Sequence, residues 1–211
     1  MVKHKLFIVN LKKEEEWLER WRQKGYRLTG VRPGLGRYTF EPVEGGAFVP
    51  KTRTDFRLFK GKSEFEDYLA LFEDCGWRHL YGTKSGGAQY FVQLRPDADS
   101  DIFSDTASRA TRYKRLSDFW LETVCLYIPL LIAFQVSGAF DLNKMLHPKQ
   151  LYLTPGLWEL TGFSFWRAFL FETPFALGRG FAGVLFLLIL LLYAWFGLKA
   201  LYWYRKEIKA P

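Results

Sequence analysis

The stretch that decides the fold is FAGVLFLLILLLYAWFGL, residues 181–198, because these 18 consecutive residues carry no charge. About 20 apolar residues in a helix cross the ~30 Å hydrocarbon core of a bilayer, and aromatic residues extend this run to Tyr204. The sequence therefore predicts a transmembrane helix over 181–204. A second apolar run at 117–140, containing Glu122 and Pro129, predicts another. Together they predict an α-helical membrane hairpin.

The flanks of the two runs indicate how the hairpin is oriented. Basic residues concentrate on the cytoplasmic side of membrane proteins, and here they precede the first run and follow the second. We therefore expect both chain ends in the cytoplasm. The lack of a cleavable signal peptide supports the same expectation for the N-terminal domain. The predicted membrane-interface anchors are Arg112, Lys114, Arg115, Trp120, Tyr202, Trp203, Tyr204 and Arg205.

The segment between the runs, 141–180, is then extracytoplasmic and unusually apolar. Residues 157–171 are rich in Trp and Phe but contain Glu159 and Arg167, which suits an interfacial helix better than a third span. This helix either lies in the outer leaflet or packs on the two spans, and the residues favour neither alternative. Residues 205–211 form a basic cytoplasmic tail.

One acidic and one basic residue lie inside the predicted spans at matching depths. Glu122 is seven residues beyond Arg115, and Lys199 is six residues before Arg205. At 1.5 Å per residue, both lie ~9–10 Å from the same boundary. The sequence raises the hypothesis of an intramembrane ion pair, against the alternative that each side chain reaches separately to the headgroups.

Residues 1–98 predict a separate cytoplasmic α+β domain, followed by a polar and basic connector at 99–116. Alternating and helical spacings of apolar residues predict a strand, a helix and two strands, and then the same order again. The first set is a strand at 6–9, a helix at 12–24 and strands at 26–32 and 38–42. The second set is a strand at 54–60, a helix and strands at 77–82 and 89–95. A capping box at Ser63 and Glu66 opens this second helix, and Gly76 ends it.

The two sets predict an internal repeat. At an offset of 51, Trp21 matches Phe72 and Gly25 matches Gly76, while Tyr38 matches Tyr90 at 52. We therefore expect one six-stranded, mostly antiparallel sheet with both helices on one face. Strand alternation would place Arg53, Arg57, Phe91 and Arg95 on the helix-free face, as a candidate surface for an anionic ligand or a protein partner. An ordinary solvated sheet face is the favoured alternative.

Composition narrows the functional classes. The 211 residues hold 30 Lys and Arg against 22 Asp and Glu, and the net charge of +8 divides into 22 − 16 = +6 for residues 1–116 and 8 − 6 = +2 for the rest. This excess of positive charge favours contact with an anionic membrane surface, whereas the acidic residues interspersed among the basic ones argue against nucleic-acid binding. No catalytic, metal-binding or cofactor motif is present, so we expect no enzyme activity and no cofactor.

Several segments together resemble a known family. They are Asp55–Phe59 (DFRLF), Glu64–Trp77 (EFEDYLALFEDCGW), Asp101–Asp105 (DIFSD) and Arg112–Arg115 (RYKR). The set is similar to the bacterial domain-of-unknown-function family 2812, over residues 1–116 and, in organisation, the two following spans. The resemblance implies a membrane protein, often encoded beside PadR-like transcriptional regulators and hence inducible. It supplies no activity and no site residues.

These observations lead to one expected function and two alternatives. We expect a non-enzymatic two-pass protein of the cell membrane, whose cytoplasmic domain binds a small or anionic ligand, a protein partner or a second copy, and which senses or modulates membrane state. A subunit of an oligomeric transporter or channel is the first alternative, since two spans alone cannot enclose a pathway. An enzyme with an unrecognised site is the second.

Overall fold

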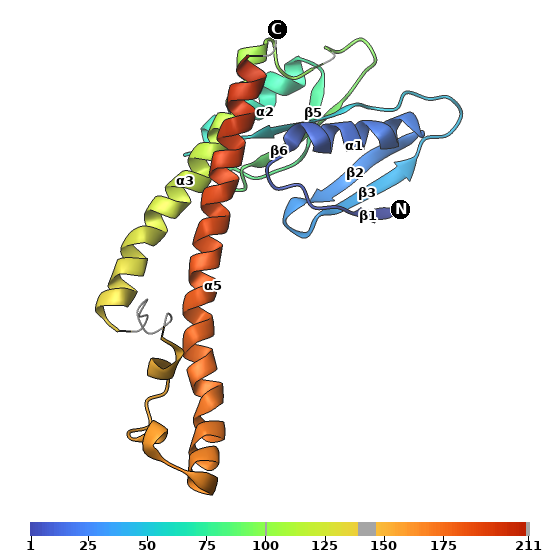
Figure 1. Ribbon diagram of the computed structural model, residues 1–211. Helices are drawn as coiled ribbons and strands as arrows, with labels where there is room; N and C mark the ends of the chain where they lie inside the picture. Colours follow the sequence, from blue (N-terminus) through green and yellow to red (C-terminus); the bar gives the residue numbers. More distant parts are fainter. Residues whose placement is uncertain (100, 139–146, 210–211) are drawn as a thin grey trace. The chain divides into compact units, whose positions relative to one another are not determined.

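A computed structural model describes residues 1–99, 101–138 and 147–209. The chain divides into two compact units, one of Met1–Phe119 with Phe196–Pro211 and the other of Trp120–Trp195. The first unit contains the α+β domain (Figure 1), and the second contains most of the two apolar runs at 117–140 and 181–198. The predicted combination of an α+β domain with long apolar helices is therefore confirmed.

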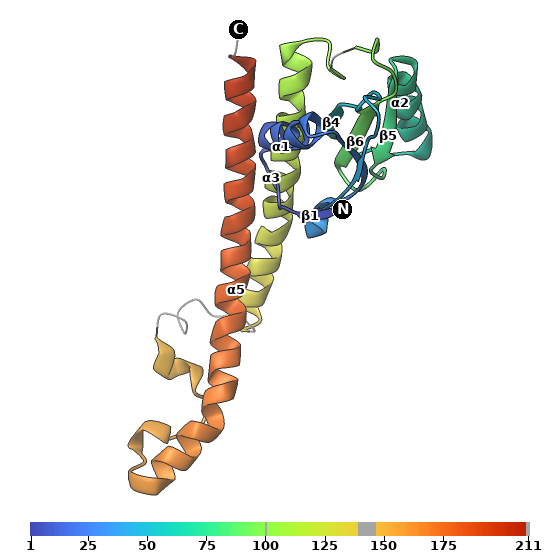
Figure 2. The same ribbon diagram turned by 90° about the vertical axis from the view of Figure 1, so that its right-hand side faces the viewer.

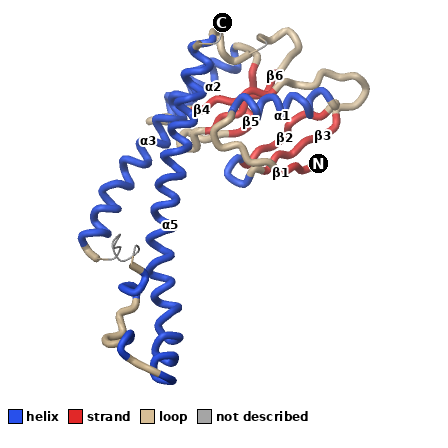
Figure 3. The backbone as a smooth tube through the Cα atoms, in the orientation of Figure 1, coloured by secondary structure: helices blue, strands red, loops and turns tan. Residues whose placement is uncertain are grey.

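The α+β domain repeats one order of elements. A strand, a helix and two antiparallel strands are followed by the same four elements (Figure 3). The first set is β1 (Val2–His4), α1 (Leu11–Gln23), β2 (Tyr26–Arg32) and β3 (Arg37–Pro42). The second set is β4 (Thr52–Phe56), α2 (Lys62–Asp74), β5 (Trp77–Tyr81) and β6 (Ala88–Gln93).

Two expected element starts are wrong. The first strand lies at Val2–His4 rather than at 6–9, where Phe7 instead packs its ring on Trp17 and Tyr38. Helix α2 begins at Lys62 with Gly61 as its N-cap, so the Ser63–Glu66 capping box does not form.

The strands form two antiparallel three-stranded sheets, ordered β1-β3-β2 and β4-β6-β5, rather than the expected single sheet. Strands β2 and β5 are neighbours, but no backbone ladder joins them among the described residues. Each contains a register shift, between Leu28 and Gly30 in β2 and between His79 and Tyr81 in β5. A bulge twists its strand and interrupts the ladder in which it lies, here that of β2 with β3 and that of β5 with β6.

Aromatic packing is repeated at the offset of 51. Trp17 and Trp21 pack on Phe40 in the first half, and Tyr68 and Phe72 pack on Phe91 in the second. The expected equivalence of Tyr38 with Tyr90 is wrong. Because Tyr90 precedes Phe91 in β6, its side chain points to the other face of the sheet.

The two helices do not share one face of the second sheet, contrary to expectation. Helix α2 covers the face that carries Phe91 and Trp77. Helix α1 packs mainly on the first sheet, but its Glu14 also accepts a hydrogen bond from Tyr90 on the opposite face. The second sheet consequently lies between α1 and α2 (Figure 2).

Among the described residues, two helices are long and apolar enough to cross a membrane, α3 (Thr106–Val136) and α5 (Gly162–Ile208). Helix α3 starts inside the expected connector, and none of the residues in its apolar window is buried within the structure. The expected end of the first span at residue 140 falls outside the described residues. Large exposed apolar side chains such as Leu126 and Ile132 need a nonaqueous environment or a partner.

Helix α5 replaces two expected elements. The interfacial helix at 157–171 does not exist as a separate element, because a 3-10 turn at Leu157–Glu159 is followed by one continuous helix of 47 residues. Pro174 is accommodated inside it. At 1.5 Å per residue this helix is ~70 Å long, about twice what a bilayer core requires.

The second unit is held together by aromatic contacts. Tyr127 packs on both Phe186 and Tyr193, which joins the second half of α3 to α5. Before α5 begins, Tyr152 stacks on Phe169, and the carboxylate of Glu172 accepts hydrogen bonds from the backbone N–H groups of Leu153 and Thr154. The residues just before α5 thus pack on its first turns.

Candidate functional site

The expected binding face does not form. Phe91 is fully buried beneath Tyr68 and Phe72 of α2, so the face that we expected to be free of helices is covered. Arg57 forms an ion pair with Glu64 at 3.2 Å, and Arg95 lies beyond the end of β6. Alternation correctly grouped Arg53 with Phe91 but could not show which face receives the helix.

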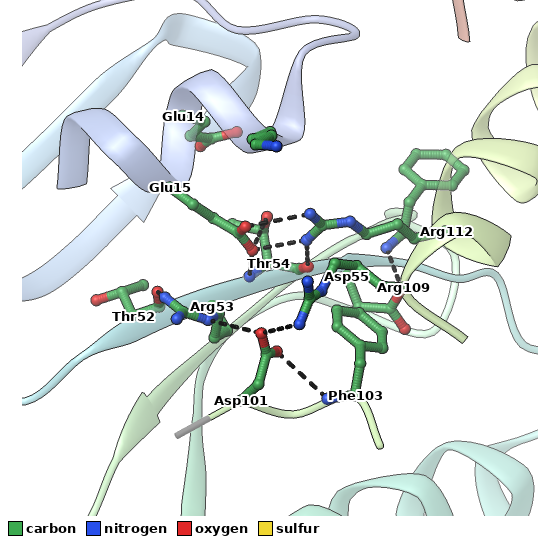
Figure 4. Close-up of polar contacts among 12 residues, drawn as sticks. Glu14, Glu15, Thr52, Arg53, Thr54, Asp55, Asp101, Phe103, Arg109 and Arg112 are labelled. Carbon is green, nitrogen blue, oxygen red and sulfur yellow. Dashed lines mark hydrogen bonds and ion pairs between the residues drawn. The ribbon is translucent and has the colours of Figure 1, made fainter. Parts of the chain in front are cut away.

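Arg112, an expected membrane anchor, is instead a core residue of the α+β domain. Only 1% of its surface is exposed. Its Nη1 donates to Glu15 Oε1 at 2.6 Å and to the carbonyl of Thr54 at 2.8 Å, while Nη2 donates to Glu15 Oε2 at 3.1 Å (Figure 4). The guanidinium of α3 thereby joins α1 to β4. It cannot lie among lipid headgroups.

Arg115 makes a parallel connection one turn later in α3. Its Nε donates to the carbonyl of Phe56 at 2.6 Å, and its Nη2 donates to Asp55 Oδ1 at 2.5 Å. Asp55 is 3% exposed and also accepts a hydrogen bond from the Tyr68 hydroxyl at 2.8 Å. Burial raises the pKa of this hydroxyl, which keeps it a donor. The first turns of α3 are therefore fixed to β4 through two arginines.

The remaining expected anchors are divided between the two units. Lys114 is exposed and pairs with Asp118 at 2.8 Å, and Trp203 stacks on Tyr113. Tyr202, Tyr204 and Arg205 follow in α5, while Trp120 belongs to the second unit. Their placement at headgroup level stays a prediction. Glu122 and Lys199 also fall in different units, so their pairing stays a prediction too.

A cleft of about 240 Å³ lies beside Arg112. Asp101 bridges two arginines at its wall, with Oδ2 3.5 Å from Arg53 and 2.8 Å from Arg109 (Figure 4). Five carboxylates and four cations line it, so neither sign dominates. The carboxylates are Glu15, Glu16, Glu19, Asp101 and Glu207, and the cations are Lys12, Arg53, Arg109 and Arg112. Such walls suit a small ligand that carries both charges.

Five separate parts of the sequence meet at the cleft. Its lining comes from α1, from β4, from Asp101 before α3, from the start of α3 and from the last turns of α5. The Nε of Arg112 is buried and has no hydrogen-bond partner among the described residues. A buried donor without a partner costs ~1–3 kcal/mol, so a ligand or water that reached it would be stabilised.

Next to Glu15, the carboxylate of Glu14 is buried between the two halves. It is 1% exposed, and its Oε1 accepts hydrogen bonds from the hydroxyls of Tyr38 and Tyr90, both at 2.6 Å. Burial raises the pKa of Glu14 to about 7 although both hydrogen bonds act to lower it. Sequence reasoning missed this residue, although its spacing from Leu11 and Leu18 places it on the buried stripe of α1.

In the described part of the chain, no group of three His, Cys, Asp or Glu side chains is arranged to hold a metal ion. His79 is partly buried and hydrogen-bonds Gln89 at 3.0 Å. Burial lowers the pKa of His79, so it is a neutral packing residue beside Phe65 and Phe91.

Comparison with known protein families identifies a match over about half of the chain. The family model described as "Protein of unknown function (DUF2812)" matches residues 10–125. The matched segment runs from the N-cap of α1 into α3 and therefore includes Glu15, Asp55, Arg112 and Arg115. No curated protein and no solved structure matches the chain.

Proposed function

The chain belongs to DUF2812, a family of proteins of unknown function, and from its own residues we propose that it is a non-enzymatic two-pass membrane protein that responds to a ligand. In this proposal the α+β domain lies in the cytoplasm and binds a small zwitterionic molecule in the cleft beside Arg112. The bound state of the cleft then alters the two helices that cross the membrane.

The observation that carries this proposal is the position of Arg112. It is buried in the α+β domain, yet it belongs to the helix whose later residues form the first apolar span. Any ligand group that competes for Glu15 or for the free Nε of Arg112 changes what holds the first turns of α3. Ligand binding and the state of a spanning helix are thereby linked through one side chain.

The distribution of charge supports the proposed topology. Arg109 and Lys114 precede the apolar part of α3, while Arg205, Lys206 and Lys209 follow that of α5. The positive-inside rule acts on the chain during insertion, so burial of Arg112 and Arg115 afterwards does not weaken it. Both ends of the chain are therefore assigned to the cytoplasm.

The experiment is to purify the full chain in mild detergent and identify small molecules released on denaturation. A zwitterionic compound should be released from the wild type and lost from Arg53→Gln/Arg109→Gln. The control, Arg27→Gln/Arg37→Gln, removes two exposed charges that do not line the cleft, and this variant should retain the compound. Adding the compound back should slow amide exchange within residues 106–119. Release that is equal from both variants, or exchange that is unchanged there, contradicts the proposal.

A further inference from the structure

A second groove adjoins the cleft, and its charge is different. It has a volume of about 550 Å³ and lies between the first turn of α1 and the last turns of α5. Four lysines and two glutamates line it, giving 4 − 2 = +2. The lysines come from two places almost 200 residues apart in the sequence, namely Lys12 and Lys13 in α1, and Lys206 in the last turn of α5 with Lys209 directly after it.

One of the two carboxylates is already compensated. Glu207 is 7% exposed, and its Oε1 lies 3.7 Å from the Nζ of Lys12. This leaves Lys13, Lys206 and Lys209 facing only Glu16. Within residues 1–99, 101–138 and 147–209, none of these three lysines forms an ion pair. Three ammonium groups thus converge on one exposed groove.

The attraction of this groove for an anion comes from these ammonium groups and not from the backbone N–H groups at the N-terminus of α1, because two of those already have partners. The backbone N–H of Lys12 already donates to the Tyr113 hydroxyl at 2.9 Å, and that of Lys13 donates to Asn10 Oδ1 at 3.0 Å. The Nζ of Lys206 lies 5.0 Å from the ring centre of Trp203, which also lines the groove. An aromatic wall beside cations offers contact to the less polar part of a charged ligand.

We propose that this groove binds a phosphate group. A phosphate ester carries one to two negative charges and several acceptor oxygens, which several lysines can share. Lys206 is eight residues beyond Leu198, the end of the uncharged run, which is ~12 Å along a helix. An anionic lipid headgroup can therefore supply the phosphate, as can a free phosphate compound, and the chemistry of recognition is the same.

The test uses the full chain in lipid nanodiscs. Inorganic pyrophosphate is titrated by calorimetry into discs of phosphatidylcholine alone, and the thermal unfolding midpoint is compared with that in discs containing phosphatidylglycerol. The variant is Lys13→Gln/Lys206→Gln/Lys209→Gln. One control is Lys60→Gln/Lys62→Gln/Lys84→Gln, which removes the same charge from three exposed lysines elsewhere, and the other replaces the three groove lysines with Arg. Unchanged unfolding of all variants in neutral discs without pyrophosphate establishes that they fold.

Two results support the proposal and separate the sources. Pyrophosphate binding that the groove variant weakens identifies a free phosphate compound, whereas stabilisation by phosphatidylglycerol alone identifies a lipid headgroup. Each lysine should contribute about fivefold, equivalent to ~1 kcal/mol, and the Arg variant should retain the effect. Equal losses in the groove variant and the Lys60 control, or no effect of either ligand on the wild type, would overturn it.

Discussion

The two halves of the α+β domain have the same elements but use them differently. Residue 14 in α1 and residue 65 in α2 are equivalent at the offset of 51, yet the first is a buried glutamate and the second is a phenylalanine that packs on Phe59 and His79. Glu14 and Glu15 reach the other half and α3, whereas Phe65 stays within its own half. Duplication supplies the scaffold, and a few polar substitutions in one half supply the candidate site.

The largest expected effect on the free energy of unfolding concerns the aromatic core that both halves contain. Phe40 and Phe91 are equivalent and fully buried, each beneath two aromatic rings of its own helix. Replacing either with Ala should cost about 4 kcal/mol of unfolding free energy because it leaves a cavity. Denaturant unfolding of the full chain in detergent measures both. Costs that differ by more than about twofold would show that the two cores are not equivalent.

The second largest effect on stability concerns the buried contact between Glu15 of the first half and Arg112 of α3. Arg112→Ala should destabilise the domain by about 3 kcal/mol, since Glu15 and the Thr54 carbonyl lose a buried charged partner. The same unfolding measurement applies. Arg27→Ala breaks a pair whose side chains are about half exposed and should cost under ~1 kcal/mol. Similar costs for the two variants would contradict a special role for Arg112.

A pH titration sharpens the contrast between Glu14 and its neighbours. The pKa of Glu14 is about 7 in the folded state and ~4.3 in an unfolded chain. The folded state therefore binds the proton more tightly than the unfolded state. The contribution of Glu14 to the free energy of unfolding should be complete below about pH 4 and should fall by about 2–3 kcal/mol as the pH rises to 7. Glu14→Gln should remove this slope, and the exposed Glu66→Gln should leave it. Identical slopes in wild type and Glu14→Gln would exclude the buried carboxyl as its source.

The smallest effect compares the glycines that end α1 and α2. Gly25 and Gly76 have φ of +79° and +81°, where a side chain costs ~1–2 kcal/mol. An added Cβ at Gly25 meets no atom within 4 Å, but at Gly76 it comes within 2.7 Å of the Ala98 Cβ. Gly76→Ala should therefore lower the thermal midpoint more than Gly25→Ala. The reverse order would contradict the packing of residues 97–98 against this turn.

Much of the element order could be predicted from the sequence because it depends on local rules. Strand β2 occupies Tyr26–Arg32 as expected, and helices α1 and α2 end before Gly25 and Gly76. Sheet faces could not be predicted in the same way. Alternation shows which side chains share a face, but both faces of β6 carry aromatic residues, and only tertiary packing decides that Phe91 meets α2 and Tyr90 meets Glu14.

The site was missed for a related reason. Arg112 and Arg115 stand just before an apolar run, where basic residues are usually membrane anchors. Their partners Glu15 and Asp55 lie 97 and 60 residues earlier, and no local pattern connects such distant charges. The first turns of α5 were assigned to a separate helix because Glu159, just before α5, and Arg167, within it, interrupt the apolar segment 157–171, yet an α-helix tolerates charged residues that face outward.

The contacts of Arg112 and Arg115 have a consequence for aggregation. β4 is an edge strand, and the backbone groups on its outer side are already bonded by side chains: Thr54 N–H by Glu15, the Thr54 carbonyl by Arg112 and the Phe56 carbonyl by Arg115. An open edge is a template on which another chain can add a strand. The two arginines therefore occupy the positions that a strand from a second molecule would need, and losing them would leave a surface on which copies of the protein could polymerise.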